Sequence, residues 1–421
     1  MENEKQALKL DYGKTILIGL GFFASSLLWS IYNSFVPLIL NDFLTSTTVI
    51  GIVMTIDNFF GVIFQPLFGS VSDRTHTRFG KRMPYIMVGA PLCGILFALI
   101  PRMPTMLALM LVVIAFNFLM SVWRSPMIAL MPDLTPAPLR SKANGIINLM
   151  GGLASIVAFL VGGKIADRYG LGSTFMMGTV VMFIAVIVLF LFVKEKRTTE
   201  DKQLAEELNL KKEKKTVKEG TLSSFKLLPK AQRKSLLFIL LAIFFWFCAF
   251  NAVETFFTSY ATTHLGQTDG QAAILLAFFS VSFVIFAVPS GFLAAKIGRK
   301  RTIMIGLVGL IVVFIPMIMI ENLWVLRILL MIGGIFWAFI NINSLPMVLE
   351  LAKDTELGTF TGYYYFFSFS AAIASPILFG VIRDLTLTFS SLFIYAPISF
   401  ALALICMTQV KHGEVAVSQN Q

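Results

Sequence analysis

The sequence contains few of the residues on which covalent and metal chemistry depends. Only three cysteines and three histidines occur among 421 residues, and charged side chains make up 14% of the chain. Cys93, Cys248 and Cys406 lie inside apolar runs, which indicates packing residues rather than a disulfide framework. The histidines lack metal-ligand spacing, and no P-loop, nucleophile elbow or zinc motif is present. We therefore expect a protein that is not an enzyme and that needs no cofactor or metal.

Apolar residues, in contrast, dominate the chain. They make up 57% of it, and the mean hydropathy is +0.81, values that a soluble domain of this length does not reach. Stretches long enough to cross a bilayer, about 20 residues each, recur along the whole sequence. We predict an all-α membrane protein with twelve transmembrane helices, over residues 14–40, 48–71, 84–101, 105–131, 143–165, 173–193, 234–262, 270–295, 302–320, 323–349, 358–383 and 386–409.

The two halves of the sequence repeat one another. A glycine-and-cation loop occurs in each half, with Gly80 and Gly298 218 residues apart. Other pairs lie 217 residues apart: Asp133 and Glu350, Gly145 and Gly362, Gly163 and Gly380, Asp167 and Asp384. Such a repeat is typical of transporters built from two bundles around a shared site. We predict two pseudo-symmetric six-helix bundles, residues 1–193 and 234–421, joined by a cytoplasmic linker over residues 194–233.

The distribution of charge predicts the orientation. The net charge of +11 does not indicate nucleic-acid binding, because the cations are not spread over a soluble surface. With the N-terminus inside, the large majority of Lys and Arg fall on the cytoplasmic side of the predicted helices, as the positive-inside rule requires. We therefore expect a multi-pass protein of the plasma (inner) membrane with both termini in the cytoplasm. The linker is interpreted as a solvated connection that can also touch anionic lipid.

The loop between the second and third predicted helices carries a known signature. Gly69 and Asp73-Arg74, followed by Gly80-Lys81-Arg82, resemble the loop motif of the major facilitator superfamily, and Asp133 and Arg140 resemble its partner motif in the next cytoplasmic loop. The resemblance covers essentially the whole chain. It implies that Asp73, Arg74, Gly80, Lys81, Arg82, Asp133 and Arg140 help to hold one conformation closed. The alternative is that these charges only set the topology. In the second copy Ala295 replaces the acid, which predicts a weaker or cation-only contact.

A second resemblance is narrower. Four extra residues separate Arg74 from Gly80, and this longer loop, flanked by Pro66 and Pro84, resembles that of the sucrose/proton symporters and their glycoside-transporting relatives. The segment from Pro126 to Asp133 resembles the end of their fourth helix.

The chain also departs from those relatives. Ile128 replaces the arginine that follows the proline of the fourth-helix motif, and Asn117 replaces an acid further back on that helix. Gly61 and Gln65 replace the paired acids of the sodium-linked members. These departures favour proton coupling through another group and leave uncoupled facilitated diffusion open.

Three ionisable residues lie deep within predicted helices: Asp57, Glu254 and Arg124. Each lies about eight to ten residues from a helix end, or roughly 12–15 Å deep at 1.5 Å per residue, which is near the middle of a core about 30 Å thick. A charge there costs about 2.5–3.5 kcal/mol on insertion scales. We therefore predict that Asp57 and Glu254 are proton-coupling groups, with Arg124 as charge partner or hydrogen-bond donor. The alternative is a fixed ion pair without a transport role.

Sugars require amide or hydroxyl partners and flat apolar faces. Tryptophan and asparagine concentrate on the predicted helices that line the cavity in the family. As substrate-binding residues we predict Trp29, Asn33, Asn117, Trp123, Asn148, Asn251, Trp337 and Asn341. Amides within lipid are unfavourable without partners, but some of them can instead join helices, and some tryptophans can serve as packing residues or interfacial anchors.

The sequence therefore predicts a secondary transporter, bacterial and monomeric, that takes up a sugar or glycoside of disaccharide size with a proton by alternating access. Its expected partners are this substrate, protons and membrane lipids, and not nucleic acid. Two alternatives stay open. One is a proton-driven exporter of hydrophobic or cationic compounds, and the other is a non-transporting membrane sensor that kept the fold.

Overall fold

The computed structural model describes residues 10–75, 77–136, 139–195, 228–352 and 356–412. Across these ranges the chain is helical apart from turns and one isolated bridge between Thr77 and Gly80. Twelve helical segments within them are long and apolar enough to cross a membrane, which confirms the predicted helix count. Most of the predicted 194–233 linker lies outside the described residues.

The chain divides into two compact units. Unit 1 comprises Met1–Val36 and Phe59–Thr198, and unit 2 comprises Pro37–Asn58 and Thr199–Gln421. Residues 37–58, from the first half of the sequence, thus pack with the second half.

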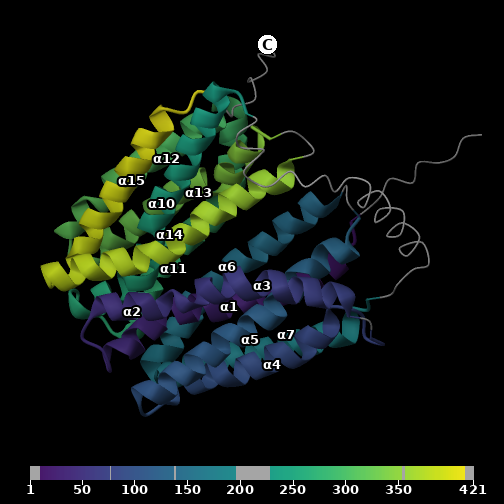
Figure 1. Ribbon diagram of the computed structural model, residues 1–421. Coiled ribbons are helices and arrows are strands. Elements are labelled where there is room, and N and C mark those ends of the chain that lie inside the picture. Colours follow the sequence, from purple (N-terminus) through teal and green to yellow (C-terminus); the bar gives the residue numbers. More distant parts are fainter. Residues whose placement is uncertain (1–9, 76, 137–138, 196–227, 353–355, 413–421) are drawn as a thin grey trace, which may run out of the picture. The chain divides into compact units, whose positions relative to one another are not determined.

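Unit 1 contains most of α1 (Tyr12–Asn41) and α3 (Ile56–Arg74), together with α4 (Met83–Leu99), η1 (Ile100–Arg102), α5 (Met106–Leu134), α6 (Arg140–Tyr169) and α7 (Leu171–Phe192). Helix α4 packs between α5 and α7 (Figure 1). Phe97 of α4 is fully buried there, with ring centroids 5.4 Å from Phe116 of α5 and 4.6 Å from Phe175 of α7. These aromatic contacts form the core of the unit.

Unit 2 contains α2 (Thr47–Met54), α10 (Lys230–Thr263), α11 (Asp269–Ile297), α12 (Arg299–Phe314), η3 (Pro316–Ile318), α13 (Leu323–Leu349), α14 (Leu357–Thr386), η4 (Phe389–Ser391) and α15 (Leu392–Thr408). Helix α10 packs against both α14 and α15, while α13 packs against α11 and α12 (Figure 1). At the crossing of α11 and α13, Gly334 leaves no room for a Cβ beside the backbone of Phe279, so glycine permits this close approach.

Several helix ends follow directly from the local sequence. Side chains of Thr105, Thr268 and Asn322 accept hydrogen bonds from the first backbone N–H groups of α5, α11 and α13, as N-cap residues do. Gly170 ends α6 and Gly298 ends α11, at φ +82° and +94°, where glycine avoids the strain of a side chain. These caps explain why the apolar runs stop where they do.

Helix α2 is held against α14 by close packing. A Cβ at Gly51 would collide with the backbone of Pro376, and one at Gly380 would collide with the backbone of Thr48. Two glycines therefore face each other's helix and let the backbones approach.

The N-terminus of α2 is also held by a carboxylate of α14. Asp384 accepts hydrogen bonds from the backbone N–H groups of Thr47 and Thr48 at 2.8 and 3.0 Å, and from the hydroxyls of Ser46 and Thr48 at 2.7 Å each. An acid at a helix N-terminus satisfies the free N–H groups and the helix dipole. This cap and the glycine contact explain why residues 37–58 group with unit 2.

The second membrane-crossing segment is broken in its middle. The sequence predicts one continuous helix over residues 48–71, but α2 ends at Met54 and α3 begins at Ile56. Thr55 forms the turn between them, and its hydroxyl donates to the carbonyl of Ile52 at 2.8 Å. This local hydrogen bond competes with the helical pattern. Asp57 therefore lies in the first turn of α3 rather than inside a continuous helix.

Candidate functional site

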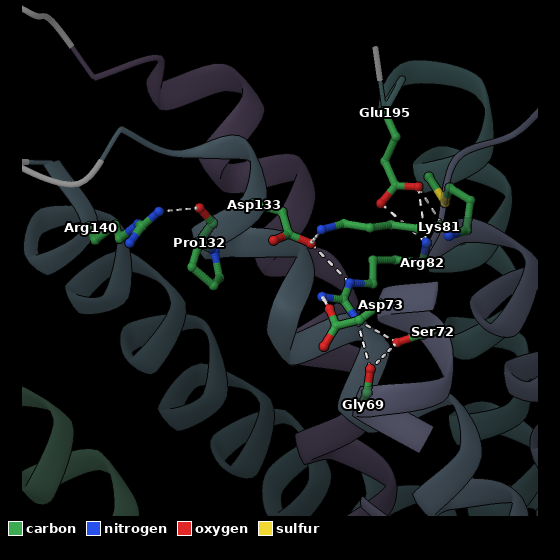
Figure 2. A network of polar contacts seen from close by, with 10 residues as sticks. Gly69, Ser72, Asp73, Lys81, Arg82, Pro132, Asp133, Arg140 and Glu195 are labelled. Carbon is green, nitrogen blue, oxygen red and sulfur yellow. Dashed lines mark hydrogen bonds and ion pairs between the residues drawn. The ribbon is translucent and has the colours of Figure 1, made fainter. Parts of the chain in front are cut away.

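The predicted loop residues of unit 1 gather around the guanidinium of Arg82 (Figure 2). Its Nε donates to Asp133 of α5 at 2.9 Å, and its Nη2 pairs with Asp73 of α3. Its Nη1 donates to the carbonyl of Gly69 at 3.1 Å and to the hydroxyl of Ser72. Only 5% of the Arg82 side chain is exposed, and every direction of its planar fork meets an acceptor.

A second cation and a second carboxylate complete this network, which we call the Arg82 cluster: Gly69, Ser72, Asp73, Lys81, Arg82, Asp133 and Glu195. Lys81 places its Nζ 3.0 Å from the Asp133 oxygen that Arg82 also contacts. Glu195, three residues beyond the end of α7, accepts hydrogen bonds from the backbone N–H groups of Arg82 at 3.0 Å and Met83 at 3.5 Å. The cluster thereby connects the ends of α3, α4, α5 and α7.

Glu195 lies in a partly enclosed environment that Gly80 makes possible. Gly80 has φ +106°, and a Cβ there would collide with the Glu195 carboxylate. Burial raises the pKa of Glu195 above its ordinary value, although the two backbone N–H groups oppose this shift. The requirement for glycine is therefore both conformational and steric.

The remaining predicted loop residues are close by but act differently. Arg140 donates to the carbonyls of Pro132 at 3.0 Å and Thr135 at 3.2 Å, and so closes the end of α5, as Figure 2 shows for Pro132. Arg74 is the last residue of α3. Of the predicted partner motif, Asp133 thus joins the Arg82 cluster and Arg140 caps a helix end.

The corresponding loop of unit 2 also contains an ion pair. Arg299, at the start of α12, pairs with Glu350 at the end of α13. The cation-only alternative for the second copy is therefore wrong, because the acid comes from the end of a distant helix instead of the loop. Arg82 to Arg299 and Asp133 to Glu350 are the same 217-residue step, so the two ion pairs are related by the sequence repeat.

Aromatic and amide side chains gather between α1 and α5 inside unit 1. Trp29 meets Tyr32 edge-on at 5.5 Å between centroids, and Tyr32 stacks on Phe116 at 5.4 Å. Asn117 donates to the Tyr32 hydroxyl at 3.2 Å. The Arg124 guanidinium carbon lies 5.8 Å from the centre of the Trp29 ring, within cation–π range. Three of the predicted residues, Trp29, Asn117 and Arg124, are thus brought together.

Other predicted residues of unit 1 lie elsewhere. Trp123 is 1% exposed and packs against Gly89 of α4, where it serves the core. Asn33 is half-buried on α1, and Asn148 is exposed on α6.

Unit 2 contains a comparable aromatic contact between α10 and α13. Trp337 stacks on Phe250 at 4.3 Å with an interplanar angle of 3°. The Asn251 amide donates to the Phe247 carbonyl of its own helix at 2.7 Å. Asn341, on α13, and Glu254, on α10, are half-buried.

Asp57 is positioned by the break in the second membrane-crossing segment. Its carboxylate accepts hydrogen bonds from the backbone N–H of Asn58 at 2.6 Å and from the Asn58 amide at 2.8 Å. The first turn of a helix favours the ionised form of a carboxylate through the helix dipole. A discontinuous helix near the middle of a membrane span is where transporters place substrate and ion sites.

Sequence reasoning missed several residues that the structure brings into these groups. Glu195 lies in a charged stretch that reads as the start of the linker, so nothing local distinguishes it. Phe116 and Phe250 are two of 41 phenylalanines, and only their place one residue before Asn117 and Asn251 could have singled them out.

The comparison with known families decides the identity of the fold. A sequence profile of the Major Facilitator Superfamily matches residues 18–268 and again residues 255–419. The chain belongs to the major facilitator superfamily. Its members are transporters and not enzymes, and the twelve apolar helices are those of a multi-pass membrane protein.

Curated relatives are similar at low identity. They include the cis,cis-muconate transport protein of Acinetobacter baylyi (26% identical over 61% of this chain), multidrug resistance protein MdtG of Dickeya zeae (26% over 68%) and the isoprimeverose transporter of Lactiplantibacillus pentosus (26% over 47%). The matched segments span 60%, 65% and 44% of these relatives. The names cover a sugar, a dicarboxylate and drugs.

Solved structures resemble the chain over nearly its full length. The nucleoside transporter NupG covers 95% of it, with 99% of its own chain matched, a TM-score of 0.70 and 16% identity. A bacterial homologue of the human lysosomal transporter Spinster covers 96%, with 95% of its own chain matched, a TM-score of 0.67 and 14% identity. At such identities the likeness shows the fold.

Proposed function

We propose that this superfamily member is a secondary transporter of the bacterial plasma membrane that takes up a sugar or glycoside together with a proton by alternating access. Both termini lie in the cytoplasm in this proposal, as the charge distribution predicts. The protein works as a monomer, in contact with its substrate, protons and lipid.

The observation that carries the proposal is the position of Asp57. The residue lies in a membrane-crossing segment, half-buried, at the start of α3 and directly after the break at Thr55. An acid in lipid is costly, and it marks a proton or ion pathway by default. Protonation removes this cost, so a cycle that moves Asp57 between wet and dry surroundings can carry a proton. Glu254 and Arg124 are the further members of this proposed coupling group.

The group between α1 and α5 supports a hydroxyl-rich substrate. Trp29 offers an indole whose Nε1 is enclosed and has no hydrogen-bond partner within the described part of the chain, and the same holds for the Asn117 Oδ1. Unpaired enclosed donors and acceptors are unfavourable, so a ligand with hydroxyl groups would satisfy both. Trp337, Asn251, Asn341, Asn33 and Asn148 complete the proposed substrate contacts, while Trp123 is better explained as packing.

The Arg82 cluster has a mechanical role in this proposal. Because it joins the ends of four helices in unit 1, it would keep them together as one body during the conformational change, with Arg74 and Arg140 at its borders. The relation of the chain to sugar transporters, rather than to others, is supported by the isoprimeverose transporter among its relatives.

The test is uptake of radiolabelled disaccharide into proteoliposomes with an imposed inward proton gradient. Wild-type uptake should rise with the gradient, whereas Asp57→Asn should lose this dependence. Asp42→Asn is the matched control, because Asp42 is an exposed acid at the end of α1. Uptake that ignores both the gradient and Asp57 would mean a facilitator.

A second candidate function is export of hydrophobic or cationic compounds. The similarity to MdtG and the largely aromatic lining between α1 and α5 favour it. Efflux of a fluorescent lipophilic cation from loaded vesicles, without uptake of any disaccharide, would establish this candidate in place of the first.

A further inference from the structure

An apolar groove runs along the surface of unit 2, between α10, α14 and α15. Its volume is about 470 Å³, within the range of roughly 300–1,000 Å³ typical of ligand sites. Phe245 and Cys248 of α10 form its floor, Ile382 of α14 lines one wall, and Ile394 and Ile398 of α15 line the other. The groove exists because α14 and α15 each pack along α10 but hardly touch one another.

The dimensions of the groove match one leaflet of a bilayer. Its lining on α14 runs from Leu378 to Thr386, and on α15 from Ser391 to Leu402, which is about 12 Å and 16 Å at 1.5 Å per residue. Half of a hydrocarbon core is about 15 Å. Ile394 and Ile398 are 51% and 55% exposed, so this surface needs an apolar environment. The groove therefore begins at the membrane surface, where α14 ends, and extends toward the bilayer centre.

The polar groups next to the groove are satisfied within the protein. The Ser375 hydroxyl donates to the Cys248 carbonyl, and the Tyr395 hydroxyl donates to Ser375 at 3.3 Å. A sugar or another hydrophilic ligand would therefore find no partners on this floor. The lining selects for a hydrocarbon chain.

A cation stands at the surface end of the groove. Arg383 follows Ile382, and its guanidinium carbon lies 4.6 Å from the centre of the Phe389 ring in η4. The Arg383 Nη1 is 3.5 Å from Asp384, whose oxygens already accept four hydrogen bonds from residues 46–48. The Arg383 Nε is enclosed without a hydrogen-bond partner among the described residues. The guanidinium thus keeps donors for a further anion.

We propose that this groove binds one acyl chain of a membrane phospholipid, with the phosphodiester of the headgroup at Arg383. Basic side chains at the ends of membrane helices bind lipid headgroups in this way. Ile382 and Asp384 lie on opposite faces of α14, because two residues span about 200° of a helix. The lipid therefore supports one face of α14 while Asp384, on the other face, holds the N-terminus of α2. This site does not depend on the identity of the transported substrate.

The first experiment uses the full chain in liposomes that contain phosphatidylglycerol with a photoactivatable acyl chain. After illumination, peptide mapping should find labelling of the groove segments of α10, α14 and α15 several-fold above that of α7. Ile398→Trp should fill the groove and remove most of this labelling. Ile187→Trp is the matched control, because Ile187 on α7 is 54% exposed against 55% for Ile398. Equal labelling of both surfaces, unchanged by Ile398→Trp, would show bulk lipid only and overturn the proposal.

The second experiment tests the headgroup. Native mass spectrometry of the detergent-purified protein should show a retained phospholipid in the wild type and a several-fold loss of it in Arg383→Gln. Inorganic phosphate at millimolar concentration should not displace the lipid. If phosphate displaces it, Arg383 is a site for free anions. Full retention in Arg383→Gln would contradict the assignment of the phosphodiester to this residue.

Discussion

Arg82 in unit 1 and Arg299 in unit 2 occupy equivalent places in the sequence repeat but very different surroundings. Each pairs with an acid at the end of a long helix, Asp133 or Glu350. The Arg82 side chain is 5% exposed and meets two carboxylates, a carbonyl and a hydroxyl, whereas that of Arg299 is 34% exposed. The repeat therefore kept the ion pair, and only the first copy surrounded it with a buried network.

The connecting segments explain this difference. Helices α11 and α12 are joined by Gly298 alone, while α3 and α4 are separated by residues 75–82. The longer connection turns at Gly80 and brings Arg82 inward, where Asp73 and Glu195 can reach it. In the second copy Lys300 instead donates to the carbonyl of Val410 at 2.6 Å. A few inserted residues thus decide whether the shared ion pair is buried or exposed.

The largest expected effect is that of Arg82→Ala. Removing one partner of a buried ionic network costs about 3–5 kcal/mol, and we expect the lower end because Asp73 is 60% exposed. Thermal unfolding of the detergent-purified protein, followed by tryptophan fluorescence, should show a large decrease in Tm. Arg299→Ala is the control and should lower Tm only slightly. Equal decreases would contradict the distinction between the two copies.

A smaller loss is expected for Gly80→Ala. The positive φ costs about 1–3 kcal/mol for a residue with a side chain, and the new Cβ would also collide with Glu195. Gly170→Ala serves as the control for the strain alone, because φ is +82° there and no atom lies within 4 Å of a Cβ. The Tm of Gly80→Ala should be the lower of the two. If both variants lose the same stability, Glu195 does not pack against this turn.

Glu195 should make the stability of the first copy depend on pH. Because its folded-state pKa is raised above the ordinary 4.5, its contribution is fully present below about pH 4.5 and is lost as pH rises through the folded-state pKa. Glu195→Gln keeps the oxygen that accepts from Arg82 but does not titrate. The difference in Tm, variant minus wild type, should increase as the pH is raised from 4 to 7. A constant difference would mean that the carboxyl is not shifted.

The smallest effect is expected for the exposed pair. Double-mutant cycles of Arg299→Ala with Glu350→Ala should give a coupling of about 1 kcal/mol or less, as surface ion pairs do. The same cycle for Arg82 and Asp133 should give a clearly larger value. Similar couplings in both cycles would remove the distinction that burial makes between the two copies.

The sequence was sufficient for what depends on local composition. The predicted range 323–349 coincides with α13, and the other predicted helices lie close to the observed ones, because apolar length alone determines a membrane-crossing helix. The grouping of Arg82 with Asp133 followed from the family motif. The break at Thr55 was not predictable, because hydropathy is continuous across it and the turn depends on one hydroxyl-to-carbonyl hydrogen bond.

Contacts between distant segments account for the rest. Glu195 reaches Arg82 across 113 residues, and Asp384 reaches Thr48 across 336. No local pattern distinguishes either acid from its charged neighbours or from a topology-setting residue. The sequence repeat related Asp133 to Glu350 by position, but not the choice of Arg299 as its partner. Such pairings follow from helix packing, which periodicity does not encode.

The most direct test of the central proposal is the movement of protons when substrate is added. Proteoliposomes with an internal pH indicator and no imposed gradient should acidify inside when a disaccharide is added to wild-type protein. Asp57→Asn should show no acidification while still exchanging labelled for unlabelled sugar across the membrane. Wild-type protein that exchanges sugar without any change in internal pH would contradict proton coupling.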